Sequence, residues 1–279
     1  MDEIKEQART KTDFYRKVWA QNLFLIESRK FKYENLPANL PAREIERRLI
    51  EQGFTAVFRH PVYGLVTSYG GKAGVGIYNQ ATTYNWAQAA LGSGDGVDGV
   101  DGVIIYNTSL DRTQSGSVIA NRLLYYTNII ADIDVSLSLI AINGRALNTV
   151  GAKTDNAVNA INLWYKKLID GEPYVPLLES GIFDEVIPMI SRDCADARNL
   201  AGELDTLKTA YLKQFYNSCG VQFIEQKAER VITDEIVGDK DMLSISLYDQ
   251  LLERKEGINR INALFGTNIK VDVCNNIIT

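Results

Sequence analysis

Apolar residues recur along residues 118–142 with the spacing of one face of an α-helix. Seven of them are separated alternately by four and three positions: Ile119, Leu123, Tyr126, Ile130, Ile133, Leu137 and Ile140. Such alternation over three heptads is typical of a helix that packs along its whole length. A helix over Val118–Asn143 would be roughly 39 Å long at 1.5 Å per residue. Leu124, Val135 and Ile142 lie off this seam, so we expect the helix to be apolar on more than one face.

Patterns of the same kind predict four more helices. These cover Thr12–Asn35, Arg43–Gln52, Asp193–Ser218 and Leu243–Phe265. Gly53, Gly220 and Gly266 follow three of them, at positions where glycine often ends a helix. The mostly polar segment Gln222–Asp241 joins the last two long helices, and its length predicts a functional loop or an ordinary surface loop.

Short β-branched and aromatic runs between Gly53 and Asn107 predict strands instead of helices. The runs are Phe54–Phe58, Tyr63–Tyr69, Gly76–Asn79 and Val103–Tyr106, and each is bounded by Gly, Pro or Asn. The glycine-rich stretch Gly92–Gly102 is expected to be a loop, and the alternation of Ile269, Val271 and Val273 predicts a last strand. The expected fold class is therefore mainly α with a small β-rich module, that is, α+β.

The expected helices are long for a chain of this size. Its 279 residues are 46% hydrophobic and 23% charged, which is a globular composition. A compact globule of this length has a diameter of about 48 Å, which several helices of about 35–40 Å would nearly span. The chain either buries one such helix centrally or packs its long helices against identical neighbours in a ring or bundle.

Charge and residue counts exclude several classes of function. With a net charge of −5 and a pI near 5.1, the chain should not coat nucleic acid non-specifically. Its three cysteines are far apart, which predicts neither a disulfide framework nor a zinc ribbon and fits a reduced cytosolic origin. The N-terminus lacks the apolar stretch of a signal peptide, and no apolar run approaches the ~20 residues of a membrane span, so no membrane contact is expected.

Motifs that would indicate catalysis or ligand binding are incomplete. Gly70–Ala73 resembles a phosphate loop, but Ala73 stands where the hydroxyl residue is required. Asp95, Asp98 and Asp101 recur at every third residue, which is not the spacing of a calcium loop. The single histidine, His60, precedes a proline and is best interpreted as a turn residue. We therefore assign no catalytic residue, cofactor site or metal site.

Three stretches, in order, resemble the portal protein (upper collar, or head–tail connector) of phi29-like short-tailed bacteriophages. The stretches are Tyr33–Pro37 with the following aromatic strand, Val75–Thr82 with Gly102–Asn107 after it, and Glu229–Glu235 followed by Ile261–Val271. Their order and spacing agree over about Phe31–Val273. The resemblance implies a phage portal fold, with long tilted stem helices and wing, clip and crown regions.

The resemblance also implies how the chain is divided. Residues 1–35 would be an N-terminal arm and first stem helix, 36–111 the β-rich wing, 112–143 the second stem helix and 144–191 the clip. Residues 192–220 would be the third stem helix, 221–241 the channel loop, and 242–279 the helix and strand of the wing and crown.

Site residues follow from the same resemblance. The channel loop would present Lys227, Glu229, Arg230, Thr233, Asp234 and Glu235 to DNA, although Ala228 stands where the family has a further lysine. Cations that could face the lumen are Arg192, Arg198 and Lys208. The seven-residue seam described above would be the interface between copies.

The expected function is a non-enzymatic portal of the virion, assembled in the host cytoplasm. It would be a homo-oligomeric ring of twelve copies around non-specifically bound double-stranded DNA. Its further partners would be the major capsid and scaffolding proteins, the packaging ATPase and the lower collar or tail proteins. The acidic residues of Met1–Arg9 do not match the basic arm that binds RNA in the family. The alternatives are an intracellular helical adaptor or scaffold without a channel, and an enzyme with an unrecognised carboxylate site.

Overall fold

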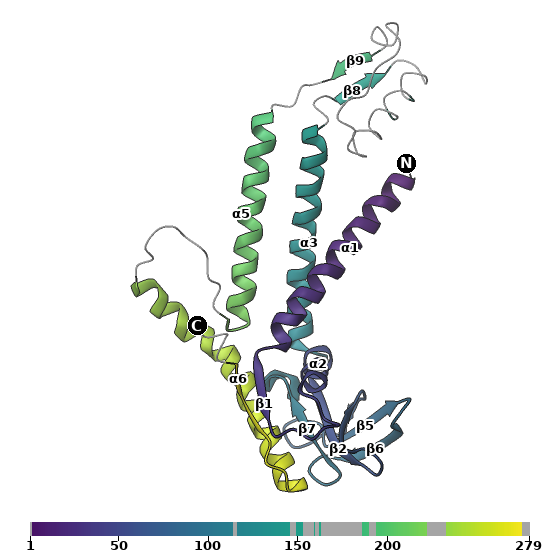
Figure 1. Ribbon diagram of the computed structural model, residues 1–279, viewed down its shortest axis with the longest axis vertical. Helices are drawn as coiled ribbons and strands as arrows, with labels where there is room; N and C mark the ends of the chain where they lie inside the picture. The colour runs from purple at the N-terminus through teal and green to yellow at the C-terminus, as the bar shows by residue number, and fades with distance from the viewer. Residues whose placement is uncertain are drawn as a thin grey trace. The chain divides into compact units, whose positions relative to one another are not determined.

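The computed structural model describes residues 2–113, 116–145, 149–152, 159, 162, 186–189, 194–221 and 233–274. The chain divides into two compact units (Figure 1). Unit 1 consists of Met1–Tyr15 with Ile129–Tyr211, and unit 2 consists of Arg16–Asn128 with Leu212–Thr279. The described fold mixes helix and sheet, as the sequence pattern predicts.

Five α-helices and one 3-10 helix lie in the described residues. They are α1 (Asp2–Ser28), α2 (Ala42–Gln52), η1 (Ser109–Arg112), α3 (Val118–Arg145), α5 (Cys194–Ser218) and α6 (Thr233–Phe265). The predicted helices 43–52, 118–143 and 193–218 are confirmed to within two residues at each end. Gly53 ends α2 with a φ of 80°, and its amide donates to the carbonyl of Leu49, as expected of a glycine after a helix.

The strands of the described residues form four small antiparallel sheets. Unit 2 contains the pair β1 (Phe31–Glu34) and β10 (Lys270–Val273), the sheet β3 (Gly64–Ser68), β2 (Phe54–His60) and β7 (Gly102–Tyr106), and the sheet β4 (Lys72–Ala73), β5 (Thr83–Gln88) and β6 (Gly92–Val97). In unit 1, β8 (Thr149–Ala152) pairs with β9 (Val186–Met189).

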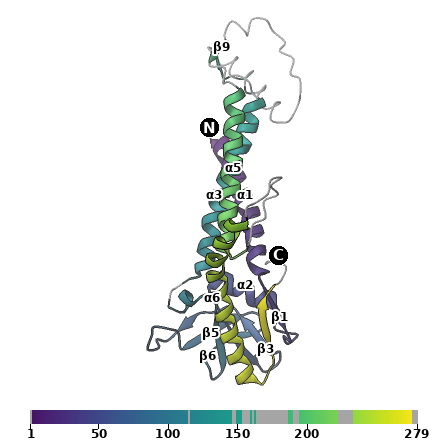
Figure 2. The same cartoon turned by 90° about the vertical axis from the view of Figure 1, so that its left-hand side faces the viewer.

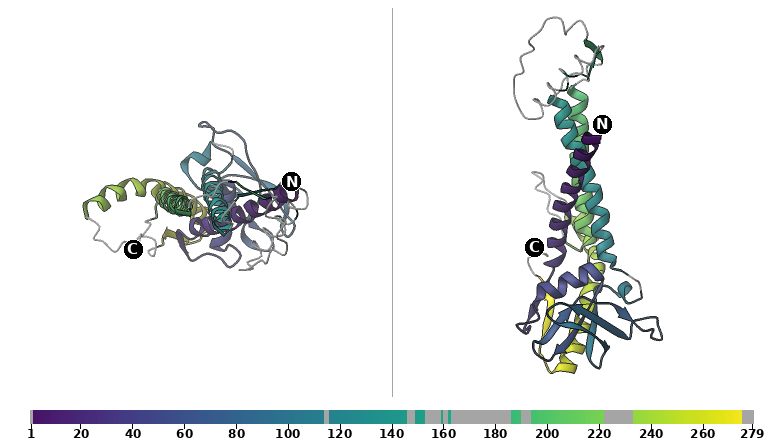
Figure 3. Two further views of the ribbon diagram at one scale, coloured as in Figure 1. Left: turned by 90° about the horizontal axis from the view of Figure 1, so that it is seen from above. Right: turned by 90° about the vertical axis from the view of Figure 1, so that its right-hand side faces the viewer.

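Unit 2 is built in layers around the sheet β3–β2–β7. One face of this sheet presents Val57, Val103 and Ile105 to apolar residues of α6, α2, β1 and β10. The other face presents Phe58 and Ile104 to side chains of β5. Helix α6 and the sheet β4–β5–β6 therefore lie on opposite faces of the central sheet. Figure 2 shows unit 2 from the side of α6, and the right-hand panel of Figure 3 shows it from the side of β5 and β6.

The predicted helix Thr12–Asn35 is wrong at both ends, and α1 already begins at Asp2. Helix α1 ends at Ser28, and Phe31–Glu34 is a strand that pairs with Val273–Lys270 of β10. The sequence Phe-Lys-Tyr-Glu alternates apolar and polar residues, which is the two-residue period of a strand. Backbone pairing with a strand more than 230 residues away therefore replaces the last turns of the expected helix.

The glycine-rich stretch was predicted to be a loop, but Gly92–Val97 is strand β6. A Cβ atom on Gly94 would overlap the ring of Trp86, and one on Gly96 would overlap Tyr84. These aromatic side chains of β5 lie against the neighbouring strand, so β6 needs residues without side chains at those positions. The glycines thus allow close packing within a strand.

Two further predictions need correction. The expected strand Gly76–Asn79 is a turn, in which the amide of Asn79 donates to the carbonyl of Gly76 at 3.1 Å. The last helix begins at Thr233 instead of Leu243, so residues 233–241 are helical and not part of a loop.

Candidate functional site

The predicted channel residues are only partly described. Three lie outside the described residues: Lys227, Glu229 and Arg230. The other three belong to the first turn of helix α6: Thr233, Asp234 and Glu235. The segment that connects α5 to α6 is therefore shorter than the sequence predicted.

Of the three predicted lumen cations, the structure describes the side chain of one, Lys208. Arg192 lies outside the described residues, and Arg198 lies in α5 with its side chain outside the described part. The ammonium of Lys208 is 2.6 Å from a carboxylate oxygen of Asp134, and both side chains are mostly buried. Within unit 1, Asp134 therefore balances the charge of Lys208.

The predicted interface seam on α3 is largely covered by this chain itself. Four of its seven side chains are buried: Ile119, Leu123, Ile130 and Ile133. The other three are half-buried: Tyr126, Leu137 and Ile140. The large apolar side chains that α3 exposes are instead Leu124, Tyr125 and Leu139.

The apolar character of α3 also bears on the question of a membrane. By length and composition, Val118–Ala141 is sufficient to cross a bilayer, contrary to the expectation that no apolar run approaches that length. Central helices of water-soluble proteins share these properties. This helix also carries Arg122, Asp132 and Asp134, and Arg122 and Asp134 form ion pairs within the chain.

A cluster of buried charges in unit 2 joins four helices. Glu27, near the end of α1, forms ion pairs with Lys30 and with Arg122 of α3. Arg122 also donates to the carbonyl of Ser218 at the end of α5, at 2.5 Å. Lys30 donates to Gln250 Oε1 of α6 at 2.9 Å. We call these residues the Glu27 cluster.

The electrostatics of the Glu27 cluster favour its charged state. Burial alone would raise the pKa of Glu27, but Lys30 and Arg122 outweigh burial and lower this pKa to about 2. The thiol of Cys219 donates to Glu27 Oε1 at 3.0 Å, and burial together with the Glu27 carboxylate raises the pKa of that thiol. Glu27 is thus a carboxylate, and Cys219 beside it is a neutral and unreactive thiol.

A second buried ion pair lies next to the Glu27 cluster. Arg254 of α6 donates two hydrogen bonds to the Glu46 carboxylate of α2, at 2.9 and 2.7 Å, and a third to Asn107 Oδ1 at 2.9 Å. Tyr33 of β1 donates to Glu46 at 2.5 Å, and burial and this carboxylate raise the pKa of Tyr33. Arg254 also donates to the main-chain carbonyl of Gln250, whose side chain accepts from Lys30. The Glu27 cluster and the Arg254–Glu46 pair therefore form one continuous buried network.

This network was missed by sequence reasoning, which assigned no role to any of its members. Charged side chains are rarely fully buried unless they are paired, and Glu27, Lys30 and Arg254 are each 1% exposed. Their partners are distant along the chain, so no local spacing indicates the pairing. What the network does is structural: it fixes the ends of α1 and α5 and the start of α3 against α6 within unit 2.

The single histidine of the chain lies in unit 2 and takes part in a turn. His60 accepts hydrogen bonds at Nδ1 from the amides of Val62 and Tyr63, so it closes a turn, as predicted. No group of three His, Cys, Asp or Glu side chains gathers as metal ligands in the described part of the chain.

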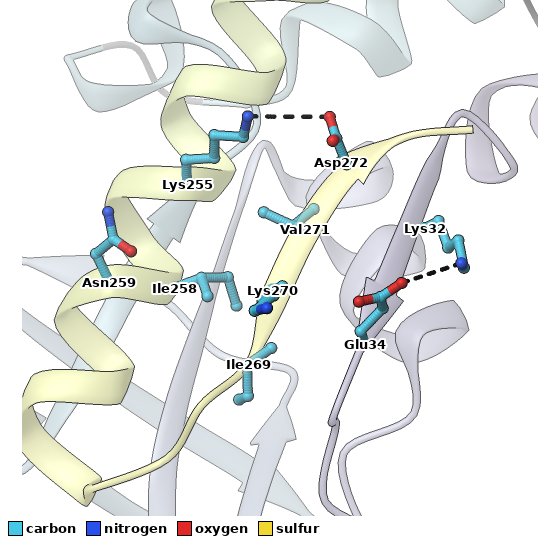
Figure 4. A pocket seen from close by; sticks show the side chains of 9 residues that line it. All are labelled: Lys32, Glu34, Lys255, Ile258, Asn259, Ile269, Lys270, Val271 and Asp272. Carbon is cyan, nitrogen blue, oxygen red and sulfur yellow. Dashed lines mark hydrogen bonds and ion pairs between the residues drawn. The ribbon is translucent and has the colours of Figure 1, made fainter. Parts of the chain in front are cut away.

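A shallow pocket of about 350 Å³ lies between α6, β10 and β1 (Figure 4). Lys32 faces Glu34 at 3.1 Å, and Lys255 faces Asp272 at 3.9 Å. Lys270 has no ion-pair partner among the described residues and is exposed. Exposed pairs of this kind contribute little energy, and we assign the pocket no ligand.

Comparisons with known proteins found a matching family model and a solved structure of similar fold. The model of the Phage Connector (GP10) family matches residues 1–278, nearly the whole chain. Among solved structures, the chain is similar to one in the portal and tail of native bacteriophage P68, with a TM-score of 0.50 and 15% sequence identity. That match covers 98% of this chain and 90% of the other. At this identity, the structural match shows a similar fold.

Proposed function

Because the chain belongs to the Phage Connector (GP10) family, its role is that of a phage portal or head–tail connector, and we propose that twelve copies surround a DNA channel at one capsid vertex. Proteins of this family are structural components of the virion, form oligomeric rings and associate with capsid and tail. In the proposed role the ring passes DNA during packaging and ejection. The family match over residues 1–278 is the observation that carries this proposal.

The long helices support the proposal. Helices α1, α3 and α5 correspond along the chain to the three proposed stem helices, and each has 25 residues or more. The proposed wing, residues 36–111, contains strands β2 to β7, and the proposed clip, residues 144–191, contains β8 and β9. We propose that the clip faces the packaging ATPase and later the tail proteins, and that the wing faces the capsid and scaffolding proteins.

The proposed contact between stem helices needs a different set of residues from the predicted seam. Ile119, Leu123, Ile130 and Ile133 are already covered within the chain, so they have little surface left for a neighbour. The exposed Leu124, Tyr125 and Leu139 of α3 are better placed. In a ring, burying them would also cover apolar surface that α3 exposes on a single chain.

The proposed channel binds DNA through few cations. The chain carries a net charge of −5, so a ring of copies is strongly acidic and repels phosphate. In the sequence, Lys227 and Arg230 precede α6, Arg192 precedes α5, and Arg198 lies near the beginning of α5. Lys208 contributes less, because its charge is balanced by Asp134.

Imaging of the purified full-length chain tests the ring directly. Negative-stain electron microscopy should show rings with a central hole, and native mass spectrometry should give a mass of twelve chains. Monomers or dimers at every concentration would overturn the ring and favour the adaptor without a channel.

A deletion tests the role of the segment before α6. Removing residues 229–235 should leave rings intact, while DNA packaged by phage that carry the deletion leaks back out of the head. The fraction of filled heads measures this leak. Loss of ring assembly in the deletion would instead show that the segment holds the ring together.

A further inference from the structure

Two exposed apolar surfaces of unit 2 have no partner in the described part of this chain. The first, which we call the apolar turn, consists of Val75, Ile77 and Tyr78 between β4 and β5, with exposed fractions of 78%, 91% and 79%. The second, which we call the α6 stripe, consists of Ile245, Tyr248 and Leu252, with exposed fractions of 67%, 60% and 46%. Each surface groups three large apolar side chains. Single exposed apolar residues are common on proteins, but contiguous groups of them often mark interaction sites.

The apolar turn is held in one shape by hydrogen bonds within it, from both main chain and side chain. The amide of Gly76 donates to the carbonyl of Gln80 at 2.8 Å, and the amide of Tyr78 donates to the side-chain oxygen of Gln80 at 3.1 Å. Asn79 adopts a left-handed conformation with a φ of 62°, which asparagine tolerates better than most residues. Ile77 and Tyr78 are therefore presented to solvent in a fixed shape, which lowers the entropy cost of binding.

The α6 stripe occupies the outward side of its helix. Leu247, Gln250, Arg254 and Ile258 are buried against the rest of unit 2. At 100° per residue, Ile245, Tyr248 and Leu252 lie on the opposite side of the helix. Their spacing of three and four positions makes a continuous apolar strip.

The two surfaces belong to opposite sides of the same compact unit. Helix α6 covers one face of the sheet β3–β2–β7, and the sheet that contains β4 and β5 covers the other (Figure 2; Figure 3, right). A closed ring of identical copies needs two different patches on each copy, so that one patch meets the other patch of the next copy. A single patch would suffice for a capsid or tail protein.

We propose that the apolar turn of one copy packs on the α6 stripe of the next copy in the ring. This inference rests on the ring assembly proposed above and names the residues that close it. Each apolar side chain that loses its exposed surface in this contact stabilises the ring by the hydrophobic effect. The occupant of each surface is thus a second copy of this chain.

Pairs of single cysteine variants test the contact and its direction. The variants Ile77→Cys and Tyr248→Cys are co-expressed as full-length chains, and a tag on one of them makes the two differ in size. The purified rings are then oxidised. We expect a disulfide-linked dimer that contains one chain of each length, and we expect each variant expressed alone to match the oxidised wild type. Rings that give no mixed dimer, or a dimer within one variant alone, would overturn the inference and leave the portal function standing. A wild-type chain that forms no rings would refute the proposed function itself.

Aspartate substitutions provide a second measurement. Ile77→Asp should weaken association of neighbouring copies by about tenfold or more, seen as loss of rings in sedimentation velocity. The matched control is Val62→Asp, at a position that is 77% exposed in the turn between β2 and β3 and belongs to neither surface. Circular dichroism checks that both variants fold. Equal ring yields for the two variants would contradict the proposal.

Discussion

Glu27 is a buried carboxylate whose neighbours determine what it can do. Its two cationic partners come from different elements, Lys30 from the chain after α1 and Arg122 from α3. A buried ion pair gives little net stability relative to apolar packing, but removing one partner leaves the other as an uncompensated buried charge. The Glu27 cluster therefore penalises any arrangement of these helices in unit 2 that separates its members.

Substitution of Glu27 by glutamine should destabilise unit 2 severely. Glu27→Gln keeps the side-chain shape but leaves Lys30, which is 1% exposed, without a counter-charge. We expect a loss of about 3–5 kcal/mol in the free energy of unfolding, measured by urea denaturation at fixed protein concentration. The matched control is Glu34→Gln in the exposed pair with Lys32, which should cost about 1 kcal/mol or less. Similar losses for both variants would show that the Glu27 cluster is not a buried charge network.

The pH dependence of stability provides an independent check on Glu27. Its pKa is about 2 in the folded chain, against an ordinary value of 4.5. A lowered pKa stabilises the fold fully above pH 4.5, and this contribution of about 3 kcal/mol is lost as the pH falls from 4.5 towards 2. Unfolding free energies between pH 6 and 2.5 should therefore fall more steeply for the wild type than for Glu27→Gln. Parallel curves would refute this assignment.

Elements that depend on local sequence could be predicted, and those that depend on distant partners could not. The apolar seam of α3 and the glycine after α2 predicted helices whose ends are nearly correct, because each pattern lies within a single element. Strand β1 was missed because it needs β10, and β6 because it needs the aromatic rings of β5. The buried charges were missed for the same reason: Glu46 and Arg254 are 208 positions apart.

The contact of α6 with the central sheet depends on the absence of a side chain at Gly257. A Cβ atom there would lie 2.7 Å from Cγ1 and 3.1 Å from Cβ of Ile105 in β7, atoms close to the backbone that cannot move aside easily. Gly257→Ala should therefore lower the unfolding free energy by about 1–3 kcal/mol despite the better helix propensity of alanine. In the control Gly202→Ala, on α5, the new methyl group meets no atom within 4 Å, and stability should rise by about 1 kcal/mol. Thermal unfolding of both variants shows whether each substitution lowers or raises stability. A gain in stability at both positions would refute close packing at Gly257.

At the scale of the whole molecule, assembly multiplies both the charge and the apolar surface of one chain. A net charge of −5 per copy makes a ring that repels DNA over most of its surface. On a single chain, the exposed apolar turn and α6 stripe would promote aggregation. The proposed ring covers both of them. The proposed assembly would thus explain why an acidic protein with exposed apolar side chains suits the proposed channel for DNA.

The salt dependence of DNA binding tests this view of the channel. Each phosphate neutralised by a cation adds about 0.9 to the slope of log K against log salt concentration, so a channel with few contacts should give a slope shallower than about −4. Fluorescence anisotropy of short linear duplexes with assembled rings measures it. Replacing Lys227 and Arg230 by alanine in every copy should move the slope towards zero, because these cations are proposed to face DNA. Lys208→Ala should leave the slope unchanged, because Asp134 already neutralises Lys208 within the chain. A steep slope that depends on Lys208 would mean that DNA displaces Asp134 and that the channel binds DNA through a continuous cationic surface.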